Sequence, residues 1–201
     1  FRRKLWCKTK KGFERQRDFT KPSVESFIFD ALIKSKLIKS DSELTEREYA
    51  KSGRTDKFVS SSGNVISLFL NVEPEKEKHL MSRLNGRLPK DIIVLGQAKV
   101  DNSFSARHQT IEREYHYFFE TINMDIDKMK QAAKLLEGKH DFQNFCKFNP
   151  TYKKSGNVRE IFLSEIEVLG AHDDGNCHLQ FARLKIKGSG FLWHQVPTLI
   201  F

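Results

Sequence analysis

The segment Gly53-Arg54-Thr55-Asp56-Lys57 contains the side chain best suited by its sequence context to do chemistry, the carboxylate of Asp56. An apolar stretch, residues 64–70, follows the segment and is expected to form a buried strand. Asp56 can therefore be held at the mouth of a cleft, where neighbouring cations keep it ionised. An ionised carboxylate can act as a nucleophile or stabilise developing positive charge. The alternative interpretation is that Thr55 and Asp56 only satisfy the backbone of a turn.

Two arginines and a tyrosine are further candidates for contact with a ligand. Arg54 and Arg107 carry forked guanidinium groups that match phosphate oxygens, although an isolated exposed arginine is more often solvated surface. Tyr115 lies in a predicted strand, residues 112–121, and shares one face of it with Tyr117. Such aromatics can pack inside a sheet, or they can stack on bases as in sheet-based RNA-recognition modules. The spacing alone leaves both roles open.

Several other chemistries lack their motifs in this sequence. There is no HxxxH or HExxH pair, and Cys7, Cys146 and Cys177 are scattered without CxxC spacing, so we expect no metal site and a reducing compartment. The patterns GxGxxG, GxxxxGK[ST] and GxSxG are also absent. No run approaches the ~20 apolar residues of a membrane span, and no apolar signal segment opens the chain. Neither a membrane protein nor a secreted one is expected.

The positive charge of the chain is concentrated near its start. The 201 residues include 35 Lys and Arg against 26 Asp and Glu, for a net charge of +9. Residues 1–21 hold nine of the basic residues and two of the acidic ones, a net of +7, which leaves +2 for the rest. A basic arm of this kind suits sequence-independent phosphate binding, and it is equally typical of a solvated terminus.

The candidate residues are spread over elements typical of an α+β fold. Helices are predicted after an N-cap at Ser23, over residues 75–84 with a left-handed stop at Gly86, and over residues 125–137. Strands are predicted at residues 64–70, 91–100, 112–121, 160–169 and 177–187. This order predicts two similar halves, ferredoxin-like or RRM-like, that share one mostly antiparallel mixed sheet flanked by helices. We divide the chain into a basic arm (1–20), an N-terminal half (21–100) with the Asp56 loop at 53–60, and a C-terminal half (101–201).

Five segments in order along the chain resemble those of the tRNA pseudouridine synthases of the TruA family, and most of all the eukaryotic branch that acts at positions 38 and 39 of the anticodon stem. The resemblance covers roughly residues 20–197 and rests on several short segments rather than on one pattern. The segments are GRTDK at 53–57 followed by GNVISL at 63–68, FSAR at 104–107, REYHYFF at 113–119, GKHDFQNFCK at 138–147, and GSGFLWHQV at 188–196.

The resemblance implies the pseudouridine synthase fold and the isomerisation of uridine in tRNA without metal or organic cofactor. Asp56 takes the position of the catalytic carboxylate, and Tyr115 that of the residue that stacks on the flipped base and could take its C5 proton. The expected RNA contacts are Arg54, Arg107, Lys57, Phe191 and Leu192. The implied partner is a tRNA anticodon stem-loop, with no membrane, an intracellular location in nucleus or cytoplasm, and a possible homodimer.

The resemblance also covers two histidine segments. His140-Asp141-Phe142 corresponds to a segment that packs near the site in the family, and we expect it to be structural, with Asp141 capping a helix. His194 is expected in the core or behind the site, and not as an acid or base.

Two positions depart from the family pattern. Phe58 stands where the family has a glycine, which can adopt backbone angles and a closeness to substrate that phenylalanine cannot. Pro197 stands where the family has a basic residue that pairs with the catalytic aspartate, so a partly buried Asp56 would be less favoured as the anion. The family also begins with a core strand that residues 1–20 do not clearly supply, and the chain stops at Phe201 where the family continues, so the fold is expected to be truncated at both ends. An RNA-binding homologue that keeps the fold and has lost the reaction is therefore the alternative hypothesis.

Overall fold

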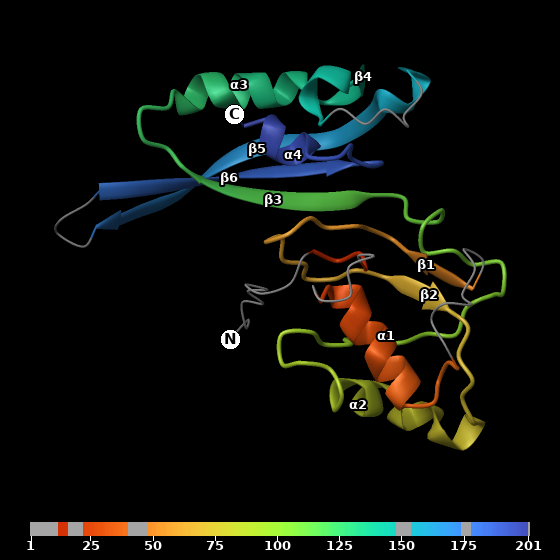
Figure 1. Ribbon diagram of the computed structural model, residues 1–201. Helices are drawn as coiled ribbons and strands as arrows, with labels where there is room; N and C mark the ends of the chain where they lie inside the picture. The colour runs from red at the N-terminus through yellow and green to blue at the C-terminus, as the bar shows by residue number, and fades with distance from the viewer. Residues whose placement is uncertain (1–11, 16–21, 40–47, 148–153, 174–177, 201) are drawn as a thin grey trace. The chain divides into compact units, whose positions relative to one another are not determined.

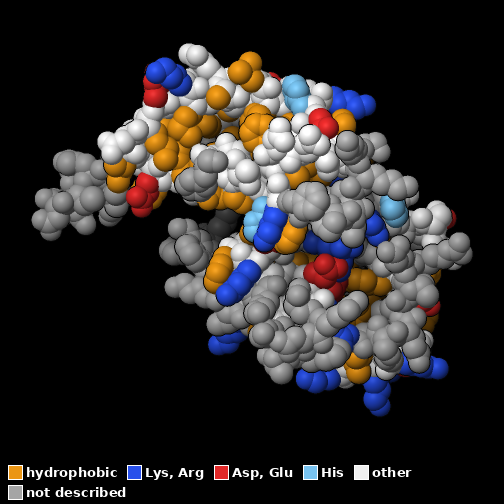
Figure 2. Space-filling view, turned by 45° about the horizontal axis from the view of Figure 1, so that its top comes forward, with side chains coloured by type: hydrophobic (Ala, Val, Ile, Leu, Met, Phe, Trp, Pro, Cys, Tyr) orange, Lys and Arg blue, Asp and Glu red, His pale blue; other side chains and the backbone are white. Residues whose placement is uncertain are grey.

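The computed structural model describes residues 12–15, 22–39, 48–147, 154–173 and 178–200 (Figure 1). The chain divides into two compact units, an N-terminal unit of residues 1–110 and a C-terminal unit of residues 111–201. Most of the predicted basic arm lies outside the described residues. On the face shown in Figure 2, the Lys and Arg side chains of the described residues lie at several separate places.

The N-terminal unit combines a short hairpin with helices. Its elements are α1 (Val24–Lys34), β1 (Tyr49–Lys51), β2 (Ile66–Leu68), the 3-10 helix η1 (Pro74–His79) and α2 (Leu80–Asn85). β1 and β2 pair antiparallel, with Tyr49 opposite Leu68 and Lys51 opposite Ile66. A hydrophobic cluster that includes Phe29, Leu32, Leu37, Leu80 and Leu84 forms the core of this unit.

Helix α1 begins as predicted, at Ser23. The Ser23 hydroxyl accepts the Ser26 N–H at 3.2 Å, and the Ser26 hydroxyl accepts the Ser23 N–H at 2.9 Å, so two free backbone donors are satisfied in a reciprocal capping box. The buried face of α1 includes the acidic residue Glu25 as well as Phe29.

The C-terminal unit is a four-stranded antiparallel sheet in the order β3-β6-β5-β4. Its elements are β3 (Arg113–Glu120), α3 (Ile126–Leu135), β4 (Gly138–Asp141), the 3-10 helices η2 (Gln143–Phe145) and η3 (Lys154–Asn157), β5 (Val158–Asp173), β6 (His178–Gly188) and α4 (Gln195–Thr198). The expected antiparallel α+β architecture is confirmed, and the sharing of one sheet by the two halves stays a prediction.

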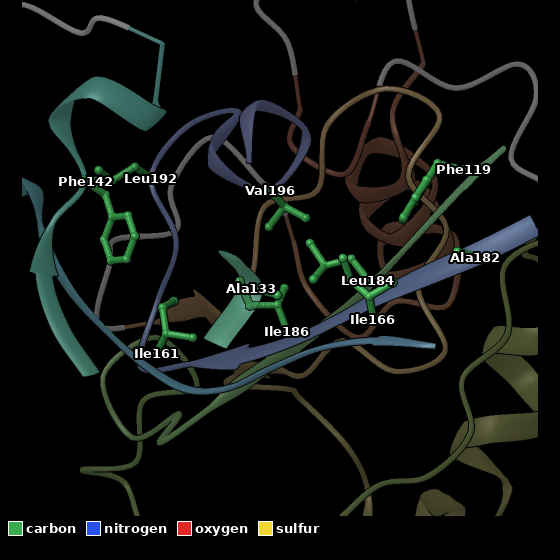
Figure 3. Close-up of a cluster of buried hydrophobic side chains, with 10 residues drawn as sticks. All are labelled: Phe119, Ala133, Phe142, Ile161, Ile166, Ala182, Leu184, Ile186, Leu192 and Val196. Carbon is green, nitrogen blue, oxygen red and sulfur yellow. The ribbon is translucent and has the colours of Figure 1, made fainter. Parts of the chain in front are cut away.

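One face of this sheet carries the hydrophobic core. Ala133 of α3 and Val196 of α4 meet the alternate, inward-facing side chains of the strands, and in Figure 3 these side chains point toward one another. The strand residues of the cluster are Phe119, Ile161, Ile166, Ala182, Leu184 and Ile186. The predicted alternation along β3 is confirmed, since Tyr115, Tyr117 and Phe119 are half-buried or buried while Glu114, His116 and Phe118 are exposed.

Three element predictions in the N-terminal unit differ from the structure. The buried strand expected over residues 64–70 is limited to β2, whose three residues are half-buried. Residues 91–100 are not a strand, because they pair with no other strand among the described residues and most of them are exposed. The helix predicted over residues 75–84 begins as η1 and becomes α-helical only at Leu80. Gly86 ends it in the right-handed region, with φ −69°, and not in the predicted left-handed one.

Among the described residues, no helix has both the length and the apolar character needed to cross a membrane.

Candidate active site

The Asp56 loop, residues 53–60, belongs to the connection between β1 and β2. Hydrogen bonds of Ser52 close the base of the loop. The Ser52 N–H donates to Val65 O at 2.9 Å, and the Ser52 hydroxyl donates to Asn64 Oδ1 at 2.6 Å. The Asn64 amide also donates to Gly53 O at 3.1 Å. Both ends of the loop are therefore held by the hairpin that the GNVISL segment helps to build.

Asp56 is exposed on this loop, and not partly buried as the sequence had suggested. Its carbonyl accepts the Val59 N–H at 3.2 Å, so residues 56–59 form a tight turn. Asp56 is therefore an exposed residue on a turn whose two ends are held by hydrogen bonds.

Phe58 occupies a backbone conformation that glycine normally supplies. Its φ is +70°, at the third position of the turn, where a type II turn requires a positive φ. A side chain at such an angle costs roughly 1–2 kcal/mol. Phe58, where the family resemblance implies a glycine, thus has glycine-type backbone angles. Its ring is 69% exposed, and the Lys57 ammonium lies 4.4 Å from the ring centre.

The strain at Phe58 gives a testable stability difference. Phe58→Gly and Phe58→Ala both remove the ring and its contact with Lys57, but only the alanine keeps a Cβ at positive φ. We expect the glycine variant to be more stable than the alanine variant by about 1 kcal/mol, measured as the difference in free energy of unfolding. Equal stability of the two variants would show that the loop relaxes to another conformation when the ring is lost.

A short stretch before α1 supports the Asp56 loop. Gly12 has φ +87°, and a Cβ built on it would lie 2.8 Å from Thr55 O, so only glycine allows this approach of the two backbones. The Phe13 N–H donates to Thr55 O at 3.0 Å, and the Phe13 side chain is buried. Residues 12–15 of the predicted basic arm are thus packed against the loop.

The two arginines predicted to contact RNA have separate supports in the N-terminal unit. Arg54 is exposed, and its Nε lies 3.3 Å from Glu14 Oε1. Arg107 is exposed on the loop that follows Phe104, and this loop is fixed to β2 because the Ala106 N–H donates to the Ser67 hydroxyl at 3.1 Å. Both arginines therefore project from segments that the β1–β2 hairpin anchors.

Tyr115 and Phe191 are brought together in the C-terminal unit. Their ring centroids are 5.0 Å apart, with the rings nearly perpendicular at 85°. Phe191 follows Gly188-Ser189-Gly190, and a Cβ on Gly188 would lie 2.7 Å from Glu160 O, so glycine is required where β6 leaves the sheet. The Arg113 side chain donates to Ser189 O at 2.8 Å and fixes the same turn.

Leu192 and Pro197 of this unit differ in their exposure to solvent. Leu192 is buried in the core with 4% of its surface exposed, so it supports the segment from inside, and direct contact with RNA stays a prediction. Gln195, which the sequence analysis did not single out, is fully buried, and its side-chain carbonyl accepts the Leu192 N–H at 2.7 Å. Pro197 is exposed in α4.

The histidine segments also differ in part from expectation. His194 is exposed, with φ +61°, so its expected place in the core is wrong: it precedes α4 at the surface. The Asp141 carboxylate accepts the Gln143 N–H at 3.0 Å and so stabilises the first turn of η2, close to the expected capping role. His140 is exposed, and its Nε2 lies 2.8 Å from Glu137 O. In the part of the chain that the structure describes, no three His, Cys, Asp or Glu side chains gather as metal ligands would.

Comparison with known proteins shows what this chain is similar to. A family model described as tRNA pseudouridine synthase matches residues 132–200. The human tRNA pseudouridine(38/39) synthase is 35% identical over 94% of this chain and 43% of its own length. The protein of the same name from Saccharomyces cerevisiae is 34% identical over 94% of this chain and 44% of its own length. The tRNA pseudouridine synthase A of Methanosarcina acetivorans is 31% identical over 89% of this chain and 60% of its own length.

The chain is thus similar to tRNA pseudouridine synthases along most of its length. It spans about half the length of the curated relatives that it matches. The matches to these relatives extend well beyond the region of the family model and take in nearly the whole chain, so both described units are part of the relationship.

Proposed function

We propose that this protein is a tRNA pseudouridine synthase that isomerises uridine at position 38 or 39 of the anticodon stem-loop. The proposal rests on one observation above all, the exposed Asp56 on a loop pinned at both ends, in a chain whose relatives carry the names tRNA pseudouridine(38/39) synthase and tRNA pseudouridine synthase A. The tRNA substrate would also place it in the nucleus or the cytoplasm.

The reaction needs no change in oxidation state. The bond between the sugar C1′ and N1 of uracil breaks, the base turns, and a bond between C1′ and C5 forms. The proton on C5 leaves, and N1 gains one, so atoms and charge balance without a cofactor. In this proposal the Asp56 carboxylate either attacks as a nucleophile or stabilises positive charge on the sugar.

Tyr115 would act on the base. The uridine must leave its stack to reach any catalytic group, and an aromatic face compensates part of that cost. Tyr115 would stack on the everted uracil, with its hydroxyl available to take the C5 proton. Phe191 holds the Tyr115 ring by edge-to-face contact, and Arg54, Arg107 and Lys57 would bind the phosphates of the stem.

Single-turnover assays on synthetic anticodon stem-loops test this function. The full-length protein is mixed in excess with stem-loops that keep uridine at position 38 only, at position 39 only, or at neither. We expect one pseudouridine per RNA in the first or second substrate and none in the third, measured by nucleoside composition. Product at a uridine outside these positions would change the assigned specificity.

A second candidate function is an RNA-binding homologue that no longer catalyses. Phe58 and Pro197 favour it, since both replace residues that serve the reaction in the family pattern. It predicts tight binding of the same stem-loops with no pseudouridine after long incubation. The retained glycine-type backbone at Phe58 favours the enzyme. A homodimer stays a prediction, which analytical ultracentrifugation of the full-length protein would test.

A further inference from the structure

Glu25 places a carboxylate in the interior of the N-terminal unit. Only 3% of its surface is exposed, on the face of α1 that also buries Phe29 and Leu32. A buried carboxylate is costly unless hydrogen bonds and an opposite charge compensate it. Three donors do so here: the Arg15 N–H at 2.7 Å, the Tyr49 hydroxyl at 2.6 Å and the Lys51 ammonium at 2.7 Å.

These donors come from the two segments that hold the Asp56 loop. Lys51 is the last residue of β1, two residues before the loop begins. Its ammonium also lies 3.1 Å from Glu14, whose carboxylate lies 3.3 Å from Arg54 within the loop. A chain of charged contacts therefore runs from Glu25 through Lys51 and Glu14 to the residue two positions before Asp56.

A second connection runs through the backbone. Glu25 accepts the Arg15 N–H with its side chain, and its own N–H donates to Phe13 O at 2.9 Å. Glu25 thus fixes residues 12–15 from both its main chain and its side chain. That stretch in turn carries Gly12 and Phe13, which contact Thr55 directly.

The Tyr49 hydroxyl keeps its hydrogen bond to Glu25 over a wide pH range. Burial, and then the hydrogen bond to the Glu25 carboxylate, raise the pKa of Tyr49 far above its ordinary value, so that its hydroxyl remains a donor.

A buried ion pair adds little stability compared with apolar side chains of similar size. The arrangement is therefore better explained by the geometry it imposes than by the stability it adds.

We propose that Glu25 is a positioning residue, which sets the place of Asp56 by joining residues 12–15 and the end of β1 beneath the Asp56 loop. This inference rests on the proposed function for its effect on the reaction, and on the contacts of Glu25 for its effect on the loop.

Glu25→Gln tests the inference, because glutamine keeps the size of the side chain and removes the charge. We expect the single-turnover rate on the stem-loop to fall by roughly 10- to 100-fold, as a displacement near 1 Å can cause, while the Kd for RNA changes less than about threefold. Amide hydrogen exchange in residues 53–60 should become faster, with exchange in β5 and β6 unchanged. Asp30→Asn, which removes an exposed charge from the same helix, is the matched control and should change neither rate nor exchange.

A second variant keeps the test decisive if Glu25→Gln folds poorly. Gly12→Ala introduces a Cβ 2.8 Å from Thr55 O and acts at the contact itself, so it should give the same loss of rate with RNA affinity retained. The inference is overturned if loop exchange and rate are both unchanged in Glu25→Gln, or if the rate falls only with the fraction of unfolded protein. If the wild-type protein makes no product, the proposed function fails, and the exchange measurement alone decides whether Glu25 positions the loop.

Discussion

Asp56→Asn is expected to abolish pseudouridine formation while RNA binding persists. Asparagine has nearly the same shape as aspartate but cannot act as a nucleophile or stabilise positive charge as a carboxylate does. Loss of such a group should lower the single-turnover rate by at least about a thousandfold. Asp56 is exposed, and its carbonyl closes the turn to Val59, so this hydrogen bond should persist in the variant. Nucleoside composition and a binding titration with the same stem-loop measure the two effects.

The matched control for this variant is Asp91→Asn, which removes one charge from a half-exposed position of the same unit. It should leave the rate and the RNA affinity near the wild-type values. Equal rates for Asp56→Asn and the wild-type protein would remove Asp56 from the proposed mechanism. A large loss of RNA affinity in Asp56→Asn would instead give this residue a role in binding.

Tyr115→Phe is expected to have the second largest effect. The variant keeps the aromatic ring and its edge-to-face contact with Phe191. It removes the hydroxyl that would take the C5 proton. We expect the single-turnover rate to fall by about a hundredfold, within the range typical of a lost general base, with RNA affinity unchanged.

Tyr117→Phe is the control for Tyr115→Phe, because Tyr117 lies two residues along the same face of β3 and loses the same hydroxyl. Its rate should stay near that of the wild-type protein. If both variants lose the same activity, the effect comes from packing on the sheet and not from chemistry at Tyr115. If neither does, the C5 proton is taken by another group.

The local elements of the fold could be predicted because their signals are local. Ser23 begins α1 with its capping box, and the alternation of Tyr115, Tyr117 and Phe119 gives the buried face of β3. The strand expected at 91–100 failed because an apolar pattern does not show whether a pairing partner exists. Gly86 was assigned a left-handed stop from its residue type alone, whereas the helix ends there with ordinary angles.

The support of the site could not be predicted, because it depends on contacts between residues distant in sequence. As an acidic residue in the first turn of α1, Glu25 is also favourable near the positive end of the helix. The spacing of residues does indicate that Glu25 is buried. Glu25 precedes Phe29 and Leu32 by four and seven residues, which puts the three on one face of a helix. No pattern in the sequence indicated that Lys51 and residues 12–15 would meet it there.

The most direct test of cofactor-free pseudouridine formation uses the wild-type full-length protein and an anticodon stem-loop, with a chelator and no added cofactor. We expect each RNA to lose one uridine and gain one pseudouridine, at position 38 or 39. Stem-loop RNA that is bound tightly by the protein, yet keeps its full uridine content after long incubation, would contradict it.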